Sequence, residues 1–225
     1  MALCCVARSR LWTGPSLPRR VTSRAVQLEA AVPRAGLDLA AVTNAAAALA
    51  DAHGLSAVTL AAVAQRLGVR SPSLYNHIDG LSALRSELAV RGLNLLQQRL
   101  EQAQAGVQGE AALHAFAQAY VAFADEHPGL YEASLRVAEP GDEEWQQAGQ
   151  NLLEMIKALL KDYSLPSKEH THAIRGLRSI LHGFCDLEHK GAFMQPISKT
   201  DSLIYIMNAY IAGLSKKVIK SQPSG

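Results

Sequence analysis

The fold is decided by residues 59–78, TLAAVAQRLGVRSPSLYNHI, in which a glycine separates two short helical patterns. Thr59 is a good N-cap for the first pattern, and Gly68 can take the positive φ angle that ends a helix sharply. Ser71 followed by Pro72 is a second start signal, because proline in the first turn gives up only an amide hydrogen that has no partner there. Two short helices joined in this way are typical of a helix-turn-helix, whose second helix enters the major groove of DNA.

The second short helix divides into an apolar side and a polar side. Leu74 is expected to anchor it against Val63 and Leu67, while Val69 drops into the core as the chain turns. The residues left facing outward are Ser71, Ser73, Asn76 and His77. The whole stretch contains two arginines and no acid, so this face does not repel phosphate. A small helical hairpin with a merely solvated polar face is the alternative interpretation.

The longer segment VTLAAVAQRLGVRSPSLYNHIDGLSAL, residues 58–84, resembles the DNA-binding domain of the TetR family of transcriptional repressors. The family's pattern is met by Thr59, Ala64, Gly68, Val69, Leu74, Tyr75, His77 and Leu84. The resemblance covers about residues 36–96. It implies that Thr59 caps the second helix beside a phosphate and that Tyr75 and His77 contact the DNA backbone. The residues it places near base edges or flanking phosphates are Arg70, Ser71, Ser73 and Asn76.

Two positions depart from the family's pattern. Ile78 stands where the family usually has an aromatic residue, which is a substitution within the core. Leu81 stands where the family usually has a lysine at the start of the fourth helix. The second departure removes a phosphate contact, so DNA affinity must come from elsewhere or be weaker.

The C-terminal half resembles a TetR subgroup whose regulatory domain carries a Trp-His-Gly signature. The matching residues are Leu181, His182, Gly183 and Phe184, followed by Leu187 and Gly191. Leu181 occupies the position of the signature's tryptophan. The resemblance implies a helical regulatory domain after the DNA-binding domain.

The rest of the chain has helical periodicity without strand patterns, which predicts an all-α protein. A first helix begins after Asp38 and ends at Gly54, and a long fourth helix begins after Asp79 and Gly80 and reaches about residue 104. Further helices are expected at 109–127, 129–138, 141–163, 167–190 and 200–220. The expected parts are a disordered basic tail over 1–35, a helix-turn-helix domain over 36–96, and a helical ligand-binding and dimerisation domain over 97–222.

The helices expected at 167–190 and 200–220 are apolar over more than one face. Spare apolar surface on a helix that already covers its own core indicates a second partner, so we predict a homodimer joined by a four-helix bundle. The residues assigned to this interface are Ile174, Leu177, Leu181, Met207, Tyr210 and Leu214. Two recognition helices about 34 Å apart would read a palindromic DNA operator with salt-sensitive affinity. Burial of both helices within a monomer is the alternative.

Large side chains of the middle helices are available to line a small-molecule cavity. They are Phe116, Tyr120, Phe123, Tyr131, Trp145, Met155 and Phe184. Each of them, taken singly, is more often a core residue. The resemblance implies that an effector bound there shifts the dimer toward a spacing that no longer fits DNA, so the chain is expected to be a ligand-responsive repressor. No cofactor is expected.

Other functional classes were weighed against this one. His182, Cys185 and His189 lie near one another along one expected helix, so a metal-sensing DNA-binding regulator is an alternative. The sequence has no nucleophile elbow, P-loop, dinucleotide-binding fingerprint or zinc-protease motif, so we do not expect an enzyme. A constitutive architectural DNA binder would need basic surface along the whole chain, and the body of the chain is slightly acidic.

Composition indicates a soluble protein with an unusual first segment. Apolar residues make up 48% of the chain, yet no apolar run reaches the roughly 20 residues needed to cross a bilayer. Three cysteines cannot form a disulfide framework, so the reducing cytoplasm is the expected compartment.

Residues 1–36 hold six arginines and one acid, a net charge of +5. Because the whole chain has a net charge of +2, the other 189 residues have a net charge of −3. This segment has the composition of an organelle transit peptide, but translation from upstream of the natural start gives the same composition and is the interpretation we favour. A basic arm that reaches into a DNA groove is a further alternative.

Overall fold

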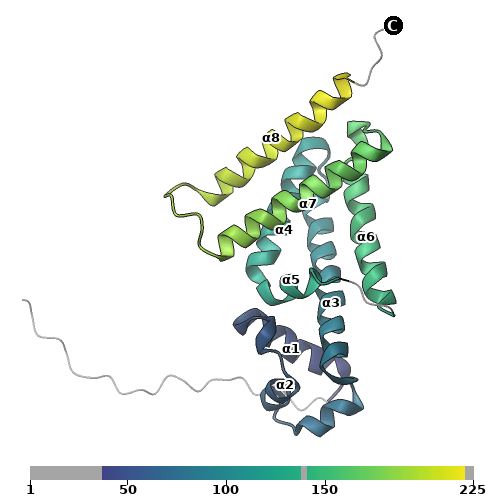
Figure 1. Cartoon of the computed structure of the whole chain (residues 1–225), viewed down its shortest axis with the longest axis vertical. Helices are drawn as coiled ribbons and strands as arrows, with labels where there is room; N and C mark the ends of the chain where they lie inside the picture. Colours follow the sequence, from purple (N-terminus) through teal and green to yellow (C-terminus); the bar gives the residue numbers. More distant parts are fainter. Residues whose placement is uncertain (1–36, 138–140, 221–225) are drawn as a thin grey trace, which may run out of the picture. The chain divides into compact units, whose positions relative to one another are not determined.

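The computed structural model describes residues 37–137 and 141–220, with side chains described as far as Leu214. Every regular element in these ranges is a helix, which confirms the all-α fold class (Figure 1). In chain order the elements are α1 (Leu39–His53), η1 (Leu55–Ala57), α2 (Leu60–Leu67), η2 (Ser71–Asn76), α3 (Gly80–Gln104), α4 (Gly109–Glu126), α5 (Pro128–Ser134), α6 (Glu143–Leu159), η3 (Lys161–Tyr163), α7 (Ser167–His189) and α8 (Lys199–Lys220). The basic tail predicted for residues 1–35 lies outside the described residues. Within the described ranges, no helix combines the length and the apolar character that a bilayer crossing requires.

Helix α1 begins and ends where the sequence predicts. Oδ1 of Asp38 accepts a hydrogen bond from the amide of Ala41 at 2.7 Å, so Asp38 is the N-cap. Gly54 ends the helix with a φ of 82°, and its amide donates to the carbonyl of Ala50. Ala46 and Ala50 are fully buried. Because these side chains are small, neighbouring elements can approach the α1 backbone closely.

Helix α3 is the longest element and runs from the N-terminal helices into the C-terminal ones (Figure 1). Leu84 and Leu88 are fully buried in its first half, and Leu96 and Leu100 are buried in its second half. It packs against α1, α4, α5 and α6. At 1.5 Å per residue its 25 residues span roughly 37 Å. A single unbroken helix of this length joins the N-terminal helices to the rest of the chain.

Two glycines allow α5 to pack directly on the backbones of α1 and α3. A Cβ atom at Gly129 in α5 would lie 2.1 Å from the carbonyl carbon of Ala50 in α1. A Cβ atom at Gly92 in α3 would lie 2.5 Å from the carbonyl oxygen of Leu130 in α5. Both distances are far below van der Waals contact, so any larger residue would push the helices apart. Helix α5 is therefore fitted closely between α1 and α3.

Two predicted helix boundaries differ from the structure. The helix expected over 129–138 is α5, which ends at Ser134 because its last turn tightens: the amides of Leu135 and Arg136 donate to carbonyls only three residues earlier. The helix expected over 141–163 is divided into α6 and η3, with Leu160 between them. In both places the apolar pattern continues past the point where the backbone hydrogen bonding changes.

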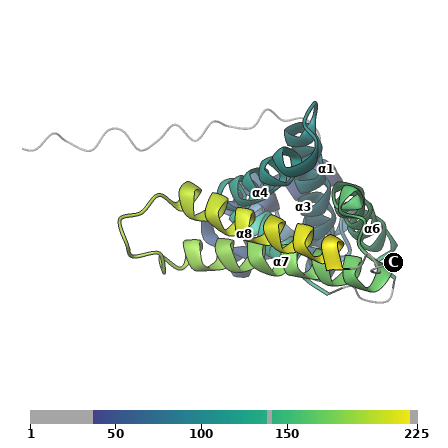
Figure 2. The same cartoon turned by 90° about the horizontal axis from the view of Figure 1, so that it is seen from above.

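Helices α7 and α8 lie side by side, and both pack on α4 (Figures 1 and 2). The phenol of Tyr210 in α8 donates a hydrogen bond to the carbonyl oxygen of Ala173 in α7 at 2.8 Å. Leu177 and Met207 are fully buried between these helices and the rest of the core. The pair therefore closes the C-terminal core on one side.

Candidate nucleic-acid interface

Helix α2 forms the first half of the interface, and the sequence fixes both of its ends. Oγ1 of Thr59 accepts a hydrogen bond from the amide of Ala62 at 3.1 Å, so Thr59 is the N-cap as predicted. Gly68 lies in the left-handed region with a φ of 69°, and the amide of Val69 donates to the carbonyl of Ala64 at 3.0 Å. Glycine reaches this conformation without the steric cost of a Cβ atom. The chain can therefore reverse direction within a few residues.

The second half is η2, which is a 3₁₀-helix and is tighter than the third helix expected up to Ile78. The amides of Ser73 and His77 bond to the carbonyls three residues earlier, those of Arg70 and Leu74, each at 2.9 Å. This pattern is common in helices too short to build a regular α-helical ladder. Leu74 is fully buried and Ile78 is 7% exposed, so these two side chains hold η2 in the core.

The residues predicted to contact DNA lie together on this pair of short helices and their turn. Tyr75 is 59% exposed, and Thr59, Arg70 and Asn76 are exposed as well. The half-buried members are Ser71, Ser73 and His77. Arg66, on the last turn of α2, is also exposed and adds a second positive charge.

This outward face has the chemistry that duplex recognition requires. Hydroxyl, phenol, amide and guanidinium groups all donate hydrogen bonds to phosphate oxygens, and amide or guanidinium groups also pair with base edges in the major groove. Residues 59–78 carry no carboxylate that would repel the phosphates. The exposed side of residues 59–78 therefore offers hydrogen-bond donors and two guanidinium groups to a nucleic-acid backbone.

A carboxylate on α1 joins the helix-turn-helix to α5. Oδ1 of Asp51 accepts hydrogen bonds from the amides of Gly129 and Leu130, both at 3.0 Å. Oδ2 of Asp51 lies 3.0 Å from Nδ1 of His127. A carboxylate at this position satisfies amides that have no partner within the helix and interacts favourably with the helix dipole. We call these three contacts of Asp51 the Asp51 clasp.

A small cavity lies among α3, α4, α5, α6 and α7. Its volume is about 30 Å³, which is room for about two water molecules. Phe116 and Tyr120, two of the seven predicted pocket residues, line it. The predicted residues that line neither this cavity nor the larger groove described next are Phe123, Tyr131, Trp145 and Met155.

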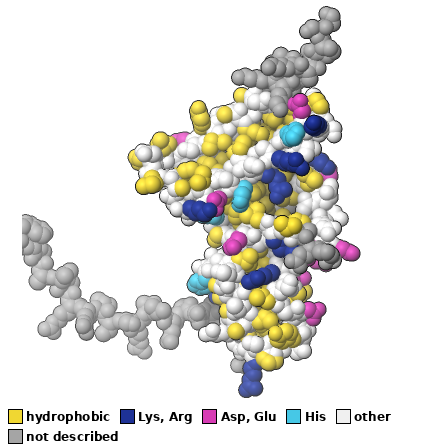
Figure 3. Space-filling view, in the orientation of Figure 1, with side chains coloured by type: hydrophobic (Ala, Val, Ile, Leu, Met, Phe, Trp, Pro, Cys, Tyr) yellow, Lys and Arg dark blue, Asp and Glu magenta, His cyan; other side chains and the backbone are white. Residues whose placement is uncertain are grey.

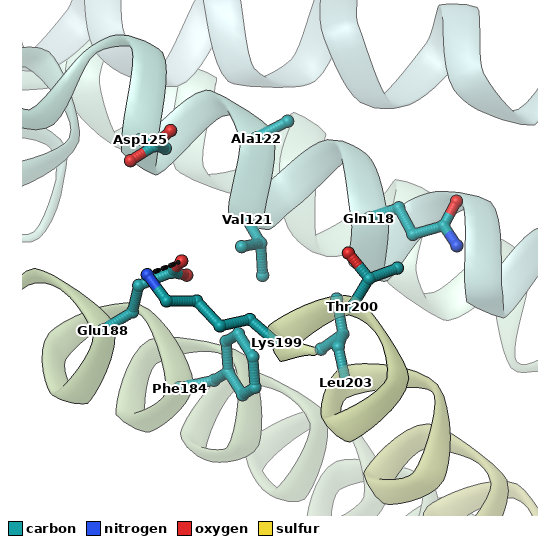
Figure 4. A pocket seen from close by; sticks show the side chains of 9 residues that line it. All are labelled: Gln118, Val121, Ala122, Asp125, Phe184, Glu188, Lys199, Thr200 and Leu203. Carbon is teal, nitrogen blue, oxygen red and sulfur yellow. Dashed lines mark ion pairs between the residues drawn. The ribbon is translucent and has the colours of Figure 1, made fainter. Parts of the chain in front are cut away.

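The larger hollow is an open groove of about 220 Å³ between α4, α7 and the start of α8 (Figure 4). Phe184 and Leu203 contribute apolar surface, and Phe184 is the one predicted pocket residue in its lining. Nζ of Lys199 lies 2.8 Å from Oε1 of Glu188, and Asp125 lines the α4 side. The groove therefore carries both signs of charge, with its lysine already paired.

Tyr131 on α5 connects α4 and α7 through its phenol. Its oxygen lies 3.3 Å from the phenol oxygen of Tyr120 and 2.8 Å from Nδ1 of His182. Burial raises the pKa of the Tyr131 phenol, and the neighbouring Tyr120 adds to this effect. Burial also raises the pKa of the Cys185 thiol, to about 12. These groups stay protonated at neutral pH and act as hydrogen-bonding partners within the core.

The described residues contain no group of three or more His, Cys, Asp or Glu side chains arranged to hold a metal ion. His182 bonds to Tyr131 through Nδ1, and Cys185 is 1% exposed. His182, Cys185 and His189 therefore do not form such a group, although they follow one another along α7.

The six residues predicted for the dimer interface lie within the single chain. Ile174, Leu177, Leu181, Met207 and Leu214 are buried there, and Tyr210 is half-buried. The five buried side chains have little surface to offer a partner, whereas Tyr210 keeps part of its surface, so an interface on α7 and α8 needs further residues. As far as side chains are described, the large apolar residues exposed on α7, on α8 and on the loop between them are Leu187, Phe193, Met194, Ile197 and Tyr205. Figure 3 shows hydrophobic side chains gathered over this pair of helices.

Comparison with known proteins matches both halves of the chain. Residues 42–80 match the family of bacterial regulatory proteins named tetR, and residues 113–210 match the tetracyclin repressor-like C-terminal domain. The HTH-type transcriptional regulator YobS of Bacillus subtilis (strain 168) is 40% identical over 183 residues, which are 81% of this chain and 95% of YobS. The chain belongs to the TetR family of transcriptional regulators.

A second curated relative and two solved structures are also similar to this chain. The HTH-type transcriptional regulator Rv0681 of Mycobacterium tuberculosis (strain ATCC 25618 / H37Rv) is 33% identical over 158 residues, 70% of this chain and 72% of Rv0681. The TetR family transcriptional regulator PfmR from Thermus thermophilus superposes with a TM-score of 0.57 at 18% identity, covering 76% of this chain and 94% of PfmR. A protein from Rhodococcus sp. RHA1 superposes with a TM-score of 0.71 at 20% identity, covering 81% of this chain and 98% of that protein. At these identities the two solved structures show the fold alone.

Two polar contacts of this TetR-family chain were missed by sequence reasoning. One is the Asp51 clasp, and the other is the ion pair of Arg136 with Asp142 at 2.6 Å, which Ser86 of α3 joins through hydrogen bonds. The HisProGly break at 127–129 does indicate a helix start whose amides need an acceptor. The acceptor lies 78 positions before Gly129, and a local pattern cannot locate it.

Proposed function

We propose that this TetR-family regulator is a ligand-responsive repressor that binds a palindromic operator as a homodimer. The observation that supports it most strongly is the α2–η2 pair, with its apolar side buried and a polar, acid-free side exposed. In this proposal residues 36–96 bind DNA, and residues 97–222 bind the ligand and form the dimer, as the sequence predicts. We further propose that it works in the cytoplasm, beside the DNA that it regulates.

On the DNA side, we assign positioning and reading to different residues. Thr59, Tyr75 and His77 contact phosphates and set the orientation of η2 on the duplex. The residues assigned to base edges and flanking phosphates are Arg70, Ser71, Ser73 and Asn76. Arg70 and Asn76 carry the side chains best suited to paired hydrogen bonds with guanine and adenine.

The proposed dimer uses the outward side of α7 and α8. The exposed apolar residues there include Met194, which is 88% exposed, and Tyr205, which is 76% exposed. Large apolar side chains gathered on one surface are typical of a protein interface. A two-fold axis between these surfaces places two copies of η2 on one duplex, about one helical turn apart.

Effector control requires that the ligand and the DNA favour different conformations of the dimer. Helix α5 is suited to link them, because it contacts α1 through the Asp51 clasp and contributes Ser134 to the cavity among α3–α7. A ligand that displaces α5 would therefore act on α1, which packs on α2 of the helix-turn-helix.

The test is selection of bound DNA by the purified full-length protein from a pool of random duplexes. We expect enrichment of an inverted repeat whose half-sites are centred about 10 base pairs, or a multiple of this, apart. A single asymmetric site would contradict the symmetric dimer. An unselected pool would contradict sequence-specific binding altogether.

A further inference from the structure

We propose that the effector is an amphipathic organic anion, an apolar chain or ring that carries a carboxylate, and that it binds in the cavity among α3–α7 with its head group against Arg178. This inference rests on the ligand-responsive function proposed above and specifies the chemistry of its effector site. It assigns the effector to the cavity among α3–α7 and not to the open groove, and it states that the effector carries a negative charge.

The lining of the cavity is almost entirely apolar. Of its eleven residues, eight are leucine, isoleucine or phenylalanine, two carry hydroxyl groups (Tyr120 and Ser134), and one, Arg178, is charged. No carboxylate lines it. A cationic ligand would therefore lose its hydration without gaining a counter-charge, whereas an anion gains one.

Arg178 is available for such a contact. It is exposed, and it forms no ion pair or hydrogen bond with a side chain or backbone group in the described part of the chain. Arg178 lines the cavity together with Tyr120: burial raises the pKa of the Tyr120 phenol, while its hydrogen bond with Tyr131 and, to a smaller extent, the charge of Arg178 lower it. A guanidinium at the edge of an apolar cavity can hold a carboxylate through two parallel hydrogen bonds.

The cavity must widen to admit this ligand. Its volume of about 30 Å³ accommodates about two water molecules and not an alkyl chain. Helix α6 is the wall with the fewest buried residues, Ala148 and Ile156, so it is the wall most readily displaced. The cavity also includes Ser134 at the end of α5. Displacing α6 moves a helix that packs on α3, and Ser134 places the C-terminal end of α5 beside the bound ligand.

The open groove fits this ligand less well, although it is larger. Its one cation, Lys199, is already paired with Glu188, and Asp125 adds a second carboxylate to the lining. An organic anion would meet a net negative lining there. The two hollows thus make opposite predictions for the charge of the preferred ligand.

The first experiment compares three probes that share a ten-carbon chain and differ in the head group: decanoate, decanol and decyltrimethylammonium. Isothermal titration calorimetry on the full-length protein measures each affinity. We expect decanoate to bind at least about tenfold more tightly than decanol, and the cation not to bind measurably. Equal binding of all three, preference for the cation, or binding of none overturns the proposal.

The second experiment compares Arg178→Met with Arg175→Met, a matched control because Arg175 is an exposed arginine on the same helix that lines neither hollow. Arg178→Met should weaken decanoate about tenfold and leave decanol unchanged, while Arg175→Met changes neither. Leu152→Trp, which fills the cavity from α6, should abolish binding of both. Equal losses in the two arginine variants would overturn the assignment of the head-group site.

A third measurement separates this inference from the function on which it rests. The affinity for the selected duplex is measured with and without decanoate. Discrimination among head groups together with a lower DNA affinity supports both proposals. Discrimination with unchanged DNA affinity contradicts ligand-responsive repression and leaves the anion site standing. Loss of DNA affinity that does not depend on the head group or on Arg178 supports ligand-responsive repression and contradicts the anion site.

Discussion

At the scale of single residues, the two roles proposed for the outward face of η2, phosphate contact and base reading, can be separated by substitution. Tyr75 and Asn76 are neighbours in sequence and are both exposed, so neither supports the core. Leu74, between them and α2, is fully buried and has a purely structural role. Changes at Tyr75 or Asn76 should therefore alter DNA binding without altering the free energy of unfolding by more than about 0.5 kcal/mol.

Tyr75→Ala should weaken binding to every duplex by a similar factor, because a phosphate contact carries no sequence information. Asn76→Ala should cost about 1–3 kcal/mol on the preferred site and less on others, since base contacts are lost only where they are made. Competition binding against a library of single-base variants measures both effects. Uniform losses for both substitutions would mean that the positioning and reading roles are misassigned.

Cys185 provides a prediction that concerns pH and not DNA. Burial raises the pKa of its thiol from 9.0 to about 12, so the folded state holds the proton more tightly than the unfolded state does. This contribution to stability is fully present below about pH 9 and declines as pH rises toward 12. Peptide mapping after treatment with iodoacetamide at pH 8 should find Cys185 unmodified in folded protein and modified in urea. Similar rates in both would show that the thiol is accessible in the native state.

At the scale of elements, the close fit of α5 between α1 and α3 is the feature most sensitive to volume. Gly129→Ala would place a methyl group 2.1 Å from the Ala50 backbone, so it should destabilise the fold by about 1–3 kcal/mol. Gly149→Ala in α6 is the matched control, because nothing lies within 4 Å of the added atom and alanine is the better helix former. Urea denaturation should show a loss for the first variant and a gain of about 0.5–1 kcal/mol for the second. A stable Gly129→Ala protein would contradict the close packing of α5.

The Asp51 clasp predicts coupling between α5 and the DNA-binding helices. Asp51→Ala removes the acceptor of two amides and the partner of His127, so the amides of Gly129 and Leu130 should exchange with solvent faster. Asp38→Ala is the control, since it removes a cap from the opposite end of α1 and touches no residue of α5. Hydrogen exchange read by mass spectrometry should distinguish them. Unchanged protection of the α5 peptide in Asp51→Ala would contradict the clasp.

The elements were predictable from the sequence where local chemistry sets their limits. Asp38, Thr59 and Gly68 act as the caps and the turn that their residue types indicate. The 3₁₀ character of η2 and the early end of α5 were not predictable, because they depend on how tertiary packing tightens a short helix. The Asp51 clasp was also not predictable from the sequence, because its partners lie far apart in sequence and meet only through tertiary packing.

At the scale of the whole molecule, the difficulty of sequence reasoning lay in separating a core from an interface. The apolar periodicity that includes Leu177 and Leu181 on α7 and Met207 on α8 is compatible with a core and with an interface. In the structure all three side chains are buried in the core of the chain itself. Periodicity identifies which residues are apolar together but not which neighbour covers them. The proposed dimer surface therefore consists of residues outside that stripe, among them Ile197 and Tyr205.

The double substitution Ile197→Asp with Tyr205→Asp should convert the proposed dimer to monomers, because it places two charges from each protomer, four in all, in an apolar interface. Asn151→Asp, on the exposed side of α6, is the control for added charge. Sedimentation equilibrium should give the monomer mass for the double variant and the dimer mass for the control. A dimer that survives the double substitution would move the interface away from this surface.

The most direct test of the helix-turn-helix assignment is methylation interference at guanine N7 on the selected duplex, because N7 lies in the major groove. Two interfering clusters, separated by about one helical turn and related by the symmetry of the site, are the predicted result. A single cluster, or no interference at any guanine N7, would contradict entry of two copies of η2 into the major groove.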